Sequence, residues 1–396
     1  MNILIVSQYY YPEQFLVNDI ATELVKRGHS VTVLTGLPNY PKGHVEKEYR
    51  FFKNRQQIID GVNIVRCFEI GRRKSIVFLA LNYLSFMISA ILKVFMMKEK
   101  FDVVYCYQLS PITTGLPAIV YKNKNKVKLL LYCLDIWPES IKSYIKNENS
   151  IFYRLLKRVS SYVYKNCDHI ACTSEAFMDY IELEHGVSIN KMIYIPQHGD
   201  SSYLKMDLKA NKTDCFNFMF AGHIGIGQDI ECIINAVELI SRDRKFKIHL
   251  VGDGNYLTNC KQIVKEKQLD DKIIFHGRID KTEMPKYYKM ADACIITLKN
   301  ITKVGLTIPG KLQTYMAAGK PIVGVIDGDA SKIIRNASCG YCVNSGDSVG
   351  LANIMIKIMN SNNLDAMGNN ARRYYEDHFT LEIHMDYLEK LLLQLR

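Results

Sequence analysis

With 396 residues, the chain is long enough for two or three domains of about 150 residues each. It is 48% hydrophobic and 23% charged, which is typical of globular proteins and excludes a mainly disordered or collagen-like chain. Its 51 Lys and Arg residues outnumber 40 Asp and Glu residues, so the formal net charge is +11. This surplus suits an anionic partner, whether a nucleotide, a nucleic acid or an anionic membrane surface, without choosing among them.

The 11 cysteines are an odd number and lie mostly in apolar runs, which predicts buried free thiols and a reducing compartment. Cys339 and Cys342 form the single C-x-x-C pair, and no second pair or nearby histidine completes a zinc site. The N-terminus lacks a basic region and a small-residue cleavage site. We therefore expect a first β-strand there and no signal peptide.

The N-terminal half alternates short apolar runs with amphipathic helices. Ile3–Val6 is followed by a helix over about Leu16–Lys26 and by a second strand, Val31–Thr35. Because both strands are too apolar for a solvated face, this βαβ unit predicts a parallel sheet whose loops gather at the strand C-termini. Further predicted strands are Val62–Phe68, Val103–Tyr107, Lys128–Leu134, His169–Thr173 and Met192–Ile195.

A second α/β series occupies the C-terminal half, so we predict an α/β protein with two doubly wound domains. Its strands are expected at Phe216–Ala221, Lys247–Val251, Lys272–His276, Ala293–Thr297, Pro321–Val325 and Gly340–Val343. The polar segment Gln197–Asp214 is the best candidate for the linker. The last amphipathic helix, Leu381–Leu395, could pack on either domain.

One apolar segment, Ile76–Met97, is long enough to span a bilayer and contains a single charge, Lys93. A transmembrane helix is disfavoured, because it would put strands of one sheet on opposite sides of the membrane. Two interpretations stay open: a buried helix between strands, or a helix whose outer apolar face enters the membrane interface. In the second, the basic residues of the region 72–100 would contact anionic lipid.

Glycine-rich turns follow the strands of the second half. Phe220–Asp229 includes Gly222, His223, Gly225 and Gln228, and opens a helix. The next turn along the chain contains Gly252 and Gly254, and the turn after it contains Arg278. Glycines let backbone N–H groups approach a phosphate at a helix N-terminus, although a single turn of this kind is equally common in plain packing.

The sharpest motif is Pro309-Gly310-Lys311 at the start of a predicted helix. A cation at this positive helix end is unfavourable unless an anion lies between them, so the motif predicts a bound diphosphate. The alternative is a solvated lysine at an ordinary turn. Neither a Walker loop nor the dinucleotide-binding fingerprint occurs in the chain.

Carboxylates follow two strands of the first half. Asp135 and Glu139 lie four residues apart at a strand-to-helix turn, and Glu13 lies in the loop after the first strand. Such loops often carry catalytic groups, although helix capping explains Asp135 and Glu139 equally well. The pair Asp327 and Asp329 could hold a divalent ion, but its glycine centre favours an ordinary turn, and we predict no metal site.

Taken in this order, these motifs resemble the GT-B glycosyltransferases of the large retaining family 4, over nearly the whole chain. The carrying residues are the Tyr-Pro-Glu loop, Gly28-His29-x-Val31, Asp135-x-Trp137-Pro138-Glu139, Ile195-Pro196-x-x-Gly199-Asp200, Phe220-x-Gly222, Val251-Gly252-Asp253-Gly254 and Met316–Pro321. Within the family, the chain is most similar to bacterial enzymes of O-antigen and capsule assembly, including L-fucosamine transferases.

The resemblance implies two Rossmann-like domains facing across a cleft: residues 1–200 for the acceptor and 201–377 for the nucleotide sugar, with helix 378–396 packing back on the first. It also implies which residues form the site. The diphosphate and nucleoside would be bound by Gly222, His223, Gly225, Gln228, Gly252, Gly254, Arg278, Lys303, Pro309, Gly310, Lys311 and Thr314. Glu13, Asp135 and Glu139 would face the reacting sugar or the acceptor.

The chain departs from the family at two places. The usual Glu-x7-Glu pair falls on Leu306 and Thr314, so the ribose contacts are in doubt. The usual Arg and Lys after the first strand of the second domain appear as His223 and Gln228. Positive charge at the diphosphate would then come from Arg278, Lys311 and Lys303.

The resulting expectation is a retaining, metal-independent glycosyltransferase with no cofactor, in the cytoplasm at the inner face of the plasma membrane. It would move a sugar, such as N-acetyl-L-fucosamine, from a UDP-sugar to a lipid-diphosphate-linked glycan of the undecaprenyl type. The alternatives are a UDP-sugar epimerase of the same fold and, because of the net charge, a nucleic-acid-binding protein. The basic residues are spread along the chain without a nucleic-acid motif, so we expect no nucleic-acid partner.

Overall fold

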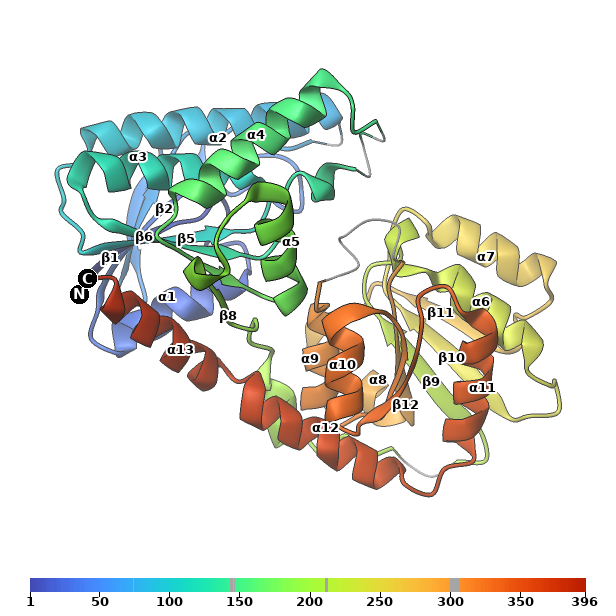
Figure 1. Cartoon of the computed structure of the whole chain (residues 1–396). Coiled ribbons are helices and arrows are strands. Elements are labelled where there is room, and N and C mark those ends of the chain that lie inside the picture. The colour runs from blue at the N-terminus through green and yellow to red at the C-terminus, as the bar shows by residue number, and fades with distance from the viewer. Residues whose placement is uncertain (74, 143–144, 146, 211–212, 300–306) are drawn as a thin grey trace. The chain divides into compact units, whose positions relative to one another are not determined.

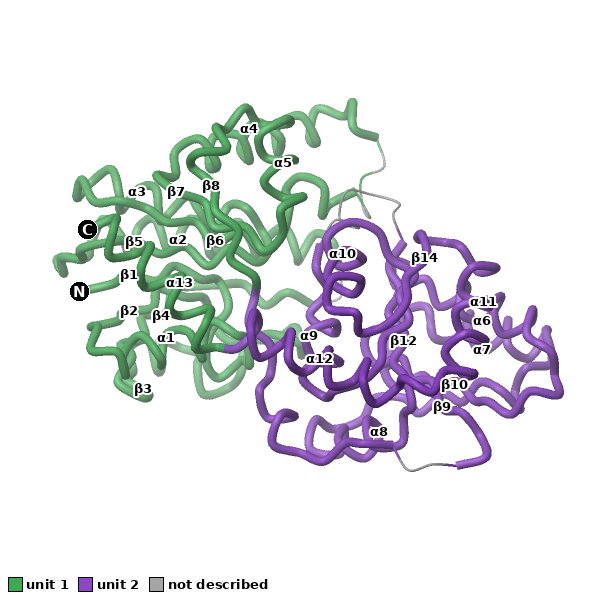
Figure 2. Tube along the Cα trace, turned by 60° about the horizontal axis from the view of Figure 1, so that its bottom comes forward, with its two compact units in different colours: residues 1–196, 381–396 green, residues 197–380 purple. Residues whose placement is uncertain are grey.

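A computed structural model describes residues 1–73, 75–142, 145, 147–210, 213–299 and 307–396. The chain forms two compact units, residues 1–196 with 381–396, and residues 197–380 (Figure 2). Each unit is an α/β layer structure around its own sheet, which confirms the predicted fold class of two Rossmann-like domains.

The sheet of unit 1 has eight strands in the order β3-β4-β2-β1-β5-β6-β7-β8. All neighbouring strands are parallel except β3 and β4. The strands are β1 Asn2–Val6, β2 Ser30–Thr35, β3 Gln56–Ile59, β4 Val62–Arg66, β5 Val103–Gln108, β6 Lys128–Cys133, β7 His169–Cys172 and β8 Met192–Tyr194. The edge strand β3 was not predicted, because Gln56-Gln57-Ile58-Ile59 is too short and too polar to stand out from a loop.

Helices cover both faces of this sheet (Figure 1). They are α1 Leu16–Lys26, α2 Ile76–Met96, α3 Gly115–Asn125, α4 Ile151–Asn166, α5 Glu175–His185 and α13 Leu381–Gln394. α1 and α13 bury one apolar face, where Ile20 and Leu388 join Ile5 and Tyr105 in a single core. α2, α3 and α4 lie in the layer on the other face.

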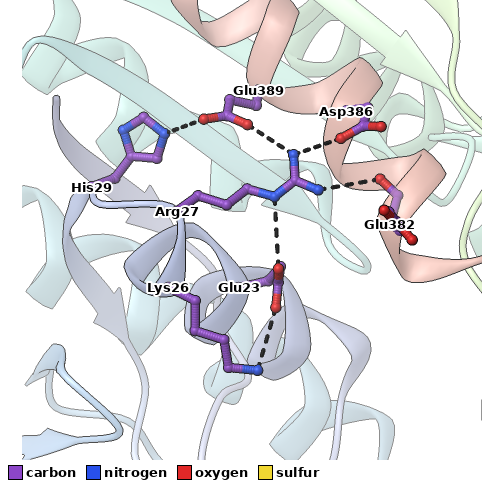
Figure 3. A network of polar contacts seen from close by, with 7 residues as sticks. All are labelled: Glu23, Lys26, Arg27, His29, Glu382, Asp386 and Glu389. Carbon is purple, nitrogen blue, oxygen red and sulfur yellow. Dashed lines mark hydrogen bonds and ion pairs between the residues drawn. The ribbon is translucent and has the colours of Figure 1, made fainter.

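The C-terminal helix α13 is fastened to α1 by a charged network (Figure 3). Arg27 Nη1 lies 2.7 Å from Asp386 Oδ1 and 2.8 Å from Glu389 Oε2, and His29 Nε2 lies 2.8 Å from Glu389 Oε1. Hydrogen bonding to Arg27 lowers the pKa of Glu389. The last helix therefore belongs to the first unit, although 184 residues of the second unit precede it.

The sheet of unit 2 has six parallel strands in the order β11-β10-β9-β12-β13-β14. They are β9 Phe216–Ala221, β10 Phe246–Val251, β11 Ile273–Gly277, β12 Ala293–Thr297, β13 Ile322–Val325 and β14 Gly340–Val343. The helices are α6 Ile230–Leu239, α7 Leu257–Glu266, α8 Met284–Met290, α9 Gly310–Ala317, α10 Gly328–Asn336, α11 Ser348–Met359 and α12 Leu364–His378. One core packs α6, α7 and α11 on one face, and a second packs α8, α9, α10 and α12 on the other.

The predicted linker, Gln197–Asp214, begins at the boundary between the units, but its first part packs in unit 2. Gly199 N donates to Phe379 O at 2.9 Å, and Tyr203 and Leu208 are buried in the second core of unit 2. The units divide after Pro196 rather than after residue 200. The polar composition of the segment did not reveal this packing, because two of its side chains, Tyr203 and Leu208, anchor it in the core of unit 2.

Candidate functional site

The carboxyl edge of the sheet in unit 2 brings most of the predicted diphosphate residues together. Because β9, β10 and β11 are adjacent and parallel, their three following loops meet at one edge. Gly222 N donates to Val251 O at 2.9 Å, and Gly252 N donates to Gly277 O at 2.8 Å. Arg278 follows directly and is exposed at the same edge.

Glycine is required where these loops touch. Gly252 has φ +143°, and a Cβ there would lie 1.8 Å from Gly222 O. A Cβ at Gly254 would lie 2.2 Å from Ile224 O and 2.8 Å from the His223 ring, which also abuts Gly225. Any larger residue would push the loops apart, so the glycines hold the backbone of the edge in close contact.

Helix α9 places its N-terminus at the end of β9. Tyr315, fully buried, accepts a hydrogen bond from Ala221 N at 2.8 Å and donates one to Ala221 O at 3.2 Å. Pro309 caps the helix without a side-chain hydrogen bond. Its fixed φ suits this position, and the first N–H groups of an α-helix have no partner within the helix.

Lys311 extends from this helix end to the glycine turn. Its Nζ donates to Gln228 Oε1, lies 4.0 Å from the centroid of the Phe220 ring, and would lie 3.4 Å from a Cβ at Gly222. Burial lowers the pKa of Lys311 to about 7. Among the residues that the structure describes, no carboxylate forms an ion pair with this amine. A partly buried lysine beside a helix N-terminus and without a counter-ion is an arrangement that an anion would stabilise.

The glycine turn itself is braced from the opposite side. Thr297 Oγ1, at the end of β12, donates to Gln228 O, and Lys299 N donates to Gly227 O at 2.9 Å. Gln228, the hydrogen-bond partner of Lys311, is therefore held by the end of β12 and the residues that follow it. Thr314 lies one turn into α9, where its hydroxyl donates to Gly310 O at 3.2 Å. Lys303 and Leu306 fall outside the described residues.

In unit 1, Asp135 lies after β6 at the carboxyl edge of the other sheet. Its Oδ2 accepts from Ser110 Oγ at 2.5 Å, its Oδ1 accepts from Ser140, and Trp137 Nε1 donates to Ser110 Oγ at 2.9 Å. Burial raises the pKa of Asp135, while these hydroxyl donors oppose the rise. The carboxylate thus ties the loop after β5 to the loop after β6.

Glu139 lies deeper, 4% exposed, and its carboxylate faces inward. Oε2 lies 2.7 Å from Lys142 Nζ, and Oε1 accepts from the hydroxyls of Tyr153 and Tyr180 at 3.2 Å each. These contacts give Glu139 a structural role in joining α4 and α5 to the loop. Its predicted catalytic role stays a prediction, as does that of Asp135.

Glu13 lies after β1 and is also buried, at 8% exposed. Oε1 accepts from Asn39 N at 2.8 Å and from Tyr40 N at 2.5 Å, which fixes the group in one orientation. Burial raises its pKa to about 7. The structure places Glu13 with Asn39 and Tyr40, in a group of contacts separate from those of Asp135 and Glu139.

Sequence reasoning missed Glu69, which is 1% exposed and accepts from Gln8 Nε2 at 2.6 Å. Burial raises its pKa well above the usual range. A signal was present: Glu69 directly follows the predicted strand Val62–Phe68, where a polar residue marks the functional edge. Asp327 and Asp329, by contrast, bind Ser345 N and Lys332 within the fold, as expected of a turn. Within the described part of the chain, no three His, Cys, Asp or Glu side chains are grouped as metal ligands.

Comparison with known proteins agrees with this architecture. Residues 15–198 match the model of Glycosyltransferase Family 4, and residues 207–374 match that of Glycosyl transferases group 1. The chain is 25% identical over 285 residues to the probable glycosyltransferase WbjE of Pseudomonas aeruginosa, covering 68% of each chain. It is 22% identical over 342 residues to WcaI of Escherichia coli (strain K12), a putative colanic acid biosynthesis glycosyl transferase, covering 81% of this chain and 82% of WcaI.

A solved structure of similar fold is Anabaena Alr3699/HepE in complex with UDP, with a TM-score of 0.73, 15% identity and full coverage of both chains. At this identity the likeness concerns the fold alone. The two family matches occupy the two units in turn, and together they extend over most of the chain. The chain is therefore a glycosyltransferase of the group 1 and family 4 type, with the GT-B fold.

Proposed function

We propose that the chain transfers a sugar from a UDP-sugar to a lipid-diphosphate-linked glycan in the assembly of a bacterial surface polysaccharide. The observation that carries the donor half of this proposal is Lys311, an amine without a carboxylate partner among the described residues, held against Gln228 at the N-terminus of α9. A nucleoside diphosphate supplies the anion that this arrangement lacks. The UDP bound to Anabaena HepE supports the choice of base.

Transition-state charge develops on the leaving UDP when the bond between the anomeric carbon and the phosphate oxygen breaks. Preoriented cations and helix N–H groups stabilise such charge strongly in a site that excludes water. Lys311 and the N-terminus of α9 would take this role, assisted by Arg278. We propose that the reaction retains the anomeric configuration and needs no metal, because the charge of the diphosphate is met by these protein groups.

The acceptor half of the proposal rests on unit 1 and its helix α2. α2 is long and apolar enough, by length and composition, to cross a membrane, and it is mostly unburied. A crossing is excluded by the sheet, since β4 before the helix and β5 after it belong to the same sheet. The inner face of α2 packs on the unit, and its outer apolar face is exposed, which supports a contact with the membrane interface.

Charge supports this membrane contact. Arg72 and Arg73 precede α2, and Lys98 and Lys100 follow it. Basic residues beside an apolar helix face are attracted to anionic lipids, at about 1 kcal/mol each near the surface. The enzyme would therefore work on the inner face of the plasma membrane, where lipid-linked acceptors are available. Both relatives, WbjE and WcaI, are named as glycosyltransferases, which favours a transferase over an epimerase for this chain.

The donor specificity within this class, for which N-acetyl-L-fucosamine is our proposal, is tested by a transfer assay. UDP-N-acetyl-L-fucosamine, other UDP-N-acetylated sugars and UDP-glucose are each offered with an undecaprenyl-diphosphate-linked saccharide, with EDTA or with Mg²⁺. We expect transfer from an N-acetylated donor, unchanged by EDTA, and an α or β product that matches the donor anomer by NMR. Conversion of the UDP-sugar without acceptor would contradict the proposal and revive the epimerase.

A further inference from the structure

Helix α2 differs from an ordinary surface helix because it has two apolar faces. Phe86, Ala90 and Val94 are buried on the inner face, which also carries polar residues, and the outer face is apolar as well. Its outer stripe consists of exposed side chains at helical spacing: Val77, Leu81, Leu84, Ile88, Leu92 and Phe95. Its inner face carries Asn82, which is fully buried, with Ser85 and Ser89 beside it. A helix of this kind has one apolar face directed away from its own protein, which is the pattern expected at a lipid boundary.

The inner polar residues bind the segment that follows β4. Ser89 Oγ donates to Phe68 O at 2.6 Å, Ser85 Oγ accepts from Ile70 N at 3.0 Å, and Asn82 Nδ2 donates to Ile70 O at 2.7 Å. The two contacts at Ile70 satisfy backbone groups that are partly buried, whereas the contact at Phe68 is exposed. They fasten the helix to the carboxyl edge of the sheet, where the loops of unit 1 gather.

Asn82 reaches further than the two serines, into a group that we call the Asn82 cluster: Gln8, Asn39, Glu69 and Asn82. Asn82 Nδ2 donates to Glu69 Oε1 at 2.5 Å and lies 3.4 Å from Asn39 Oδ1. Asn82 Oδ1 accepts from Gln8 Nε2 at 3.0 Å. All four side chains are at most 3% exposed. Glu69 Oε2 packs so closely on Gly36 that a Cβ there would lie 1.7 Å away. The cluster is therefore tightly packed and has little freedom to adjust.

The cluster ends at a predicted catalytic carboxylate. Asn39 N donates to Glu13 Oε1 at 2.8 Å, while its Oδ1 accepts from Arg72 N at 3.1 Å as well as facing Asn82. Asn39 is thus the joint between the helix and Glu13. A displacement of Asn82 would remove one donor from Glu69 Oε1 and one from Asn39 Oδ1. Glu69 would then still accept from Gln8 Nε2 and Asn39 from Arg72 N, so the cluster would be held less firmly.

We infer that Asn82 is a positioning residue that transmits the seating of α2 on anionic lipid to the carboxylate of Glu13. The inference rests on the proposed function, because it assumes that the acceptor is reached at the membrane. In water the outer stripe is exposed, so only the contacts of the inner face hold α2 on the unit. Lipid that covers the stripe stabilises this same seated orientation, so α2 opens less often and Asn82 holds the cluster and the Glu13 loop in place for a larger share of the time.

Hydrogen–deuterium exchange tests the link without requiring turnover. The full chain is measured with and without vesicles of phosphatidylcholine and phosphatidylglycerol in equal amounts. We expect vesicles to slow exchange in residues 8–15 and 36–41 by threefold or more, roughly the effect of a 0.6 kcal/mol shift in local opening. In Asn82→Ala, the vesicles should bind as before but leave exchange in these loops unchanged.

Ser89→Ala is the matched control, since Ser89 binds Phe68 O on the same face of α2 but does not touch the cluster. It should retain the vesicle effect. Asn82→Ser, which keeps a hydroxyl near Ile70 O but cannot reach Glu69, replaces the alanine variant if that variant fails to fold. Equal loop protection in wild type and folded Asn82 variants, or absence of vesicle binding, would overturn the inference. UDP affinity of the same preparations, measured by calorimetry, tests the donor site of unit 2 separately.

Discussion

Lys311 is the residue on which the proposed donor site depends most. Its pKa of about 7 means that the amine is partly neutral near physiological pH in the free protein. A bound diphosphate favours the charged form, so binding should take up a proton. Donor affinity should therefore rise as the pH falls through 7, because more of the free protein then carries the cation.

We predict that UDP-sugar affinity is roughly five- to tenfold higher at pH 6.5 than at pH 8, as expected from the titration of a group with a pKa near 7. Isothermal titration with a UDP-sugar measures this dependence, since the diphosphate diester itself does not titrate in this range. Lys311→Arg keeps the charge at every pH and should flatten the dependence. A wild-type profile as flat as that of the arginine variant would contradict the assignment.

Glu13 makes a second prediction at this scale, because burial raises its pKa to about 7 in the folded state. A raised carboxyl pKa gives a stability contribution that is complete below the unfolded pKa and is lost as the pH rises to 7. Wild type should thus lose up to about 3 kcal/mol relative to Glu13→Gln between pH 4.5 and 7. Urea unfolding at several pH values measures this difference. If the free energies of unfolding of the two proteins changed with pH in the same way, the raised pKa of Glu13 would be disproved.

Several of these residues could be predicted from the sequence, and the reasons for the others are physical. Gly222, Gly252 and Lys311 were identifiable because glycine turns and a cation at a helix start are local patterns. Phe220 was part of a recognised motif, but its contact with Lys311 was not predicted, and Tyr315 was not identified, because both roles depend on packing between α9 and β9. Glu69 was missed although it directly follows a predicted strand, because its burial arises only when β1, β4 and α2 come together.

At the scale of elements, the extent of α2 was predicted well from the sequence, but the reason for its polar residues was not. Its extent was predicted to within one residue at the C-terminal end. Its polar residues, Asn82, Ser85 and Ser89, argued against a membrane span, and the structure gives their physical reason: they bind the segment after β4. The pattern along the helix could not show which neighbour would satisfy them.

The outer stripe of α2 gives a test of the membrane contact. Ile88→Glu with Leu92→Glu replaces two exposed apolar side chains and adds negative charge, so sedimentation with anionic vesicles should fall at least tenfold while the melting temperature stays within about 2 °C. Leu155→Glu with Leu183→Glu is the matched control, because both side chains are exposed on α4 and α5 of the same unit and the pair adds the same charge. Equal loss of binding in the control would assign the effect to net charge alone.

The attachment of α13 gives a second test at this scale (Figure 3). Arg27→Met removes the guanidinium that contacts Asp386 and Glu389, so amide exchange in α13 should accelerate by about fivefold or more, corresponding to about 1 kcal/mol. Lys26→Met is the control, since Lys26 is exposed and pairs only with Glu23 among the described residues. Because the pKa of Glu389 is lowered in the folded state, the wild-type attachment should also weaken as the pH falls through that pKa.

For the whole molecule, the two units divide the proposed chemistry between them. Unit 2 holds the glycine turns and Lys311, which suit a nucleoside diphosphate, and unit 1 holds Glu13 and the apolar helix, which suit an acceptor at a membrane. The alternation of strands and helices was sufficient to predict both sheets, since every parallel strand was recognised from its apolar run. The division between the units was predicted only approximately, because Tyr203 and Leu208 anchor the polar segment in unit 2.

The central claim is that unit 2 binds a nucleoside diphosphate through the amine of Lys311 and without a metal. Thermal unfolding with UDP, GDP, ADP or CMP, each with Mg²⁺ or with EDTA, tests it most directly, because a ligand of the native state raises the melting temperature by mass action. We predict a rise with UDP that is the same in Mg²⁺ and EDTA and that is lost in Lys311→Met but kept in Lys311→Arg. No rise with any nucleotide, or a rise that requires Mg²⁺ and survives in Lys311→Met, would contradict the account.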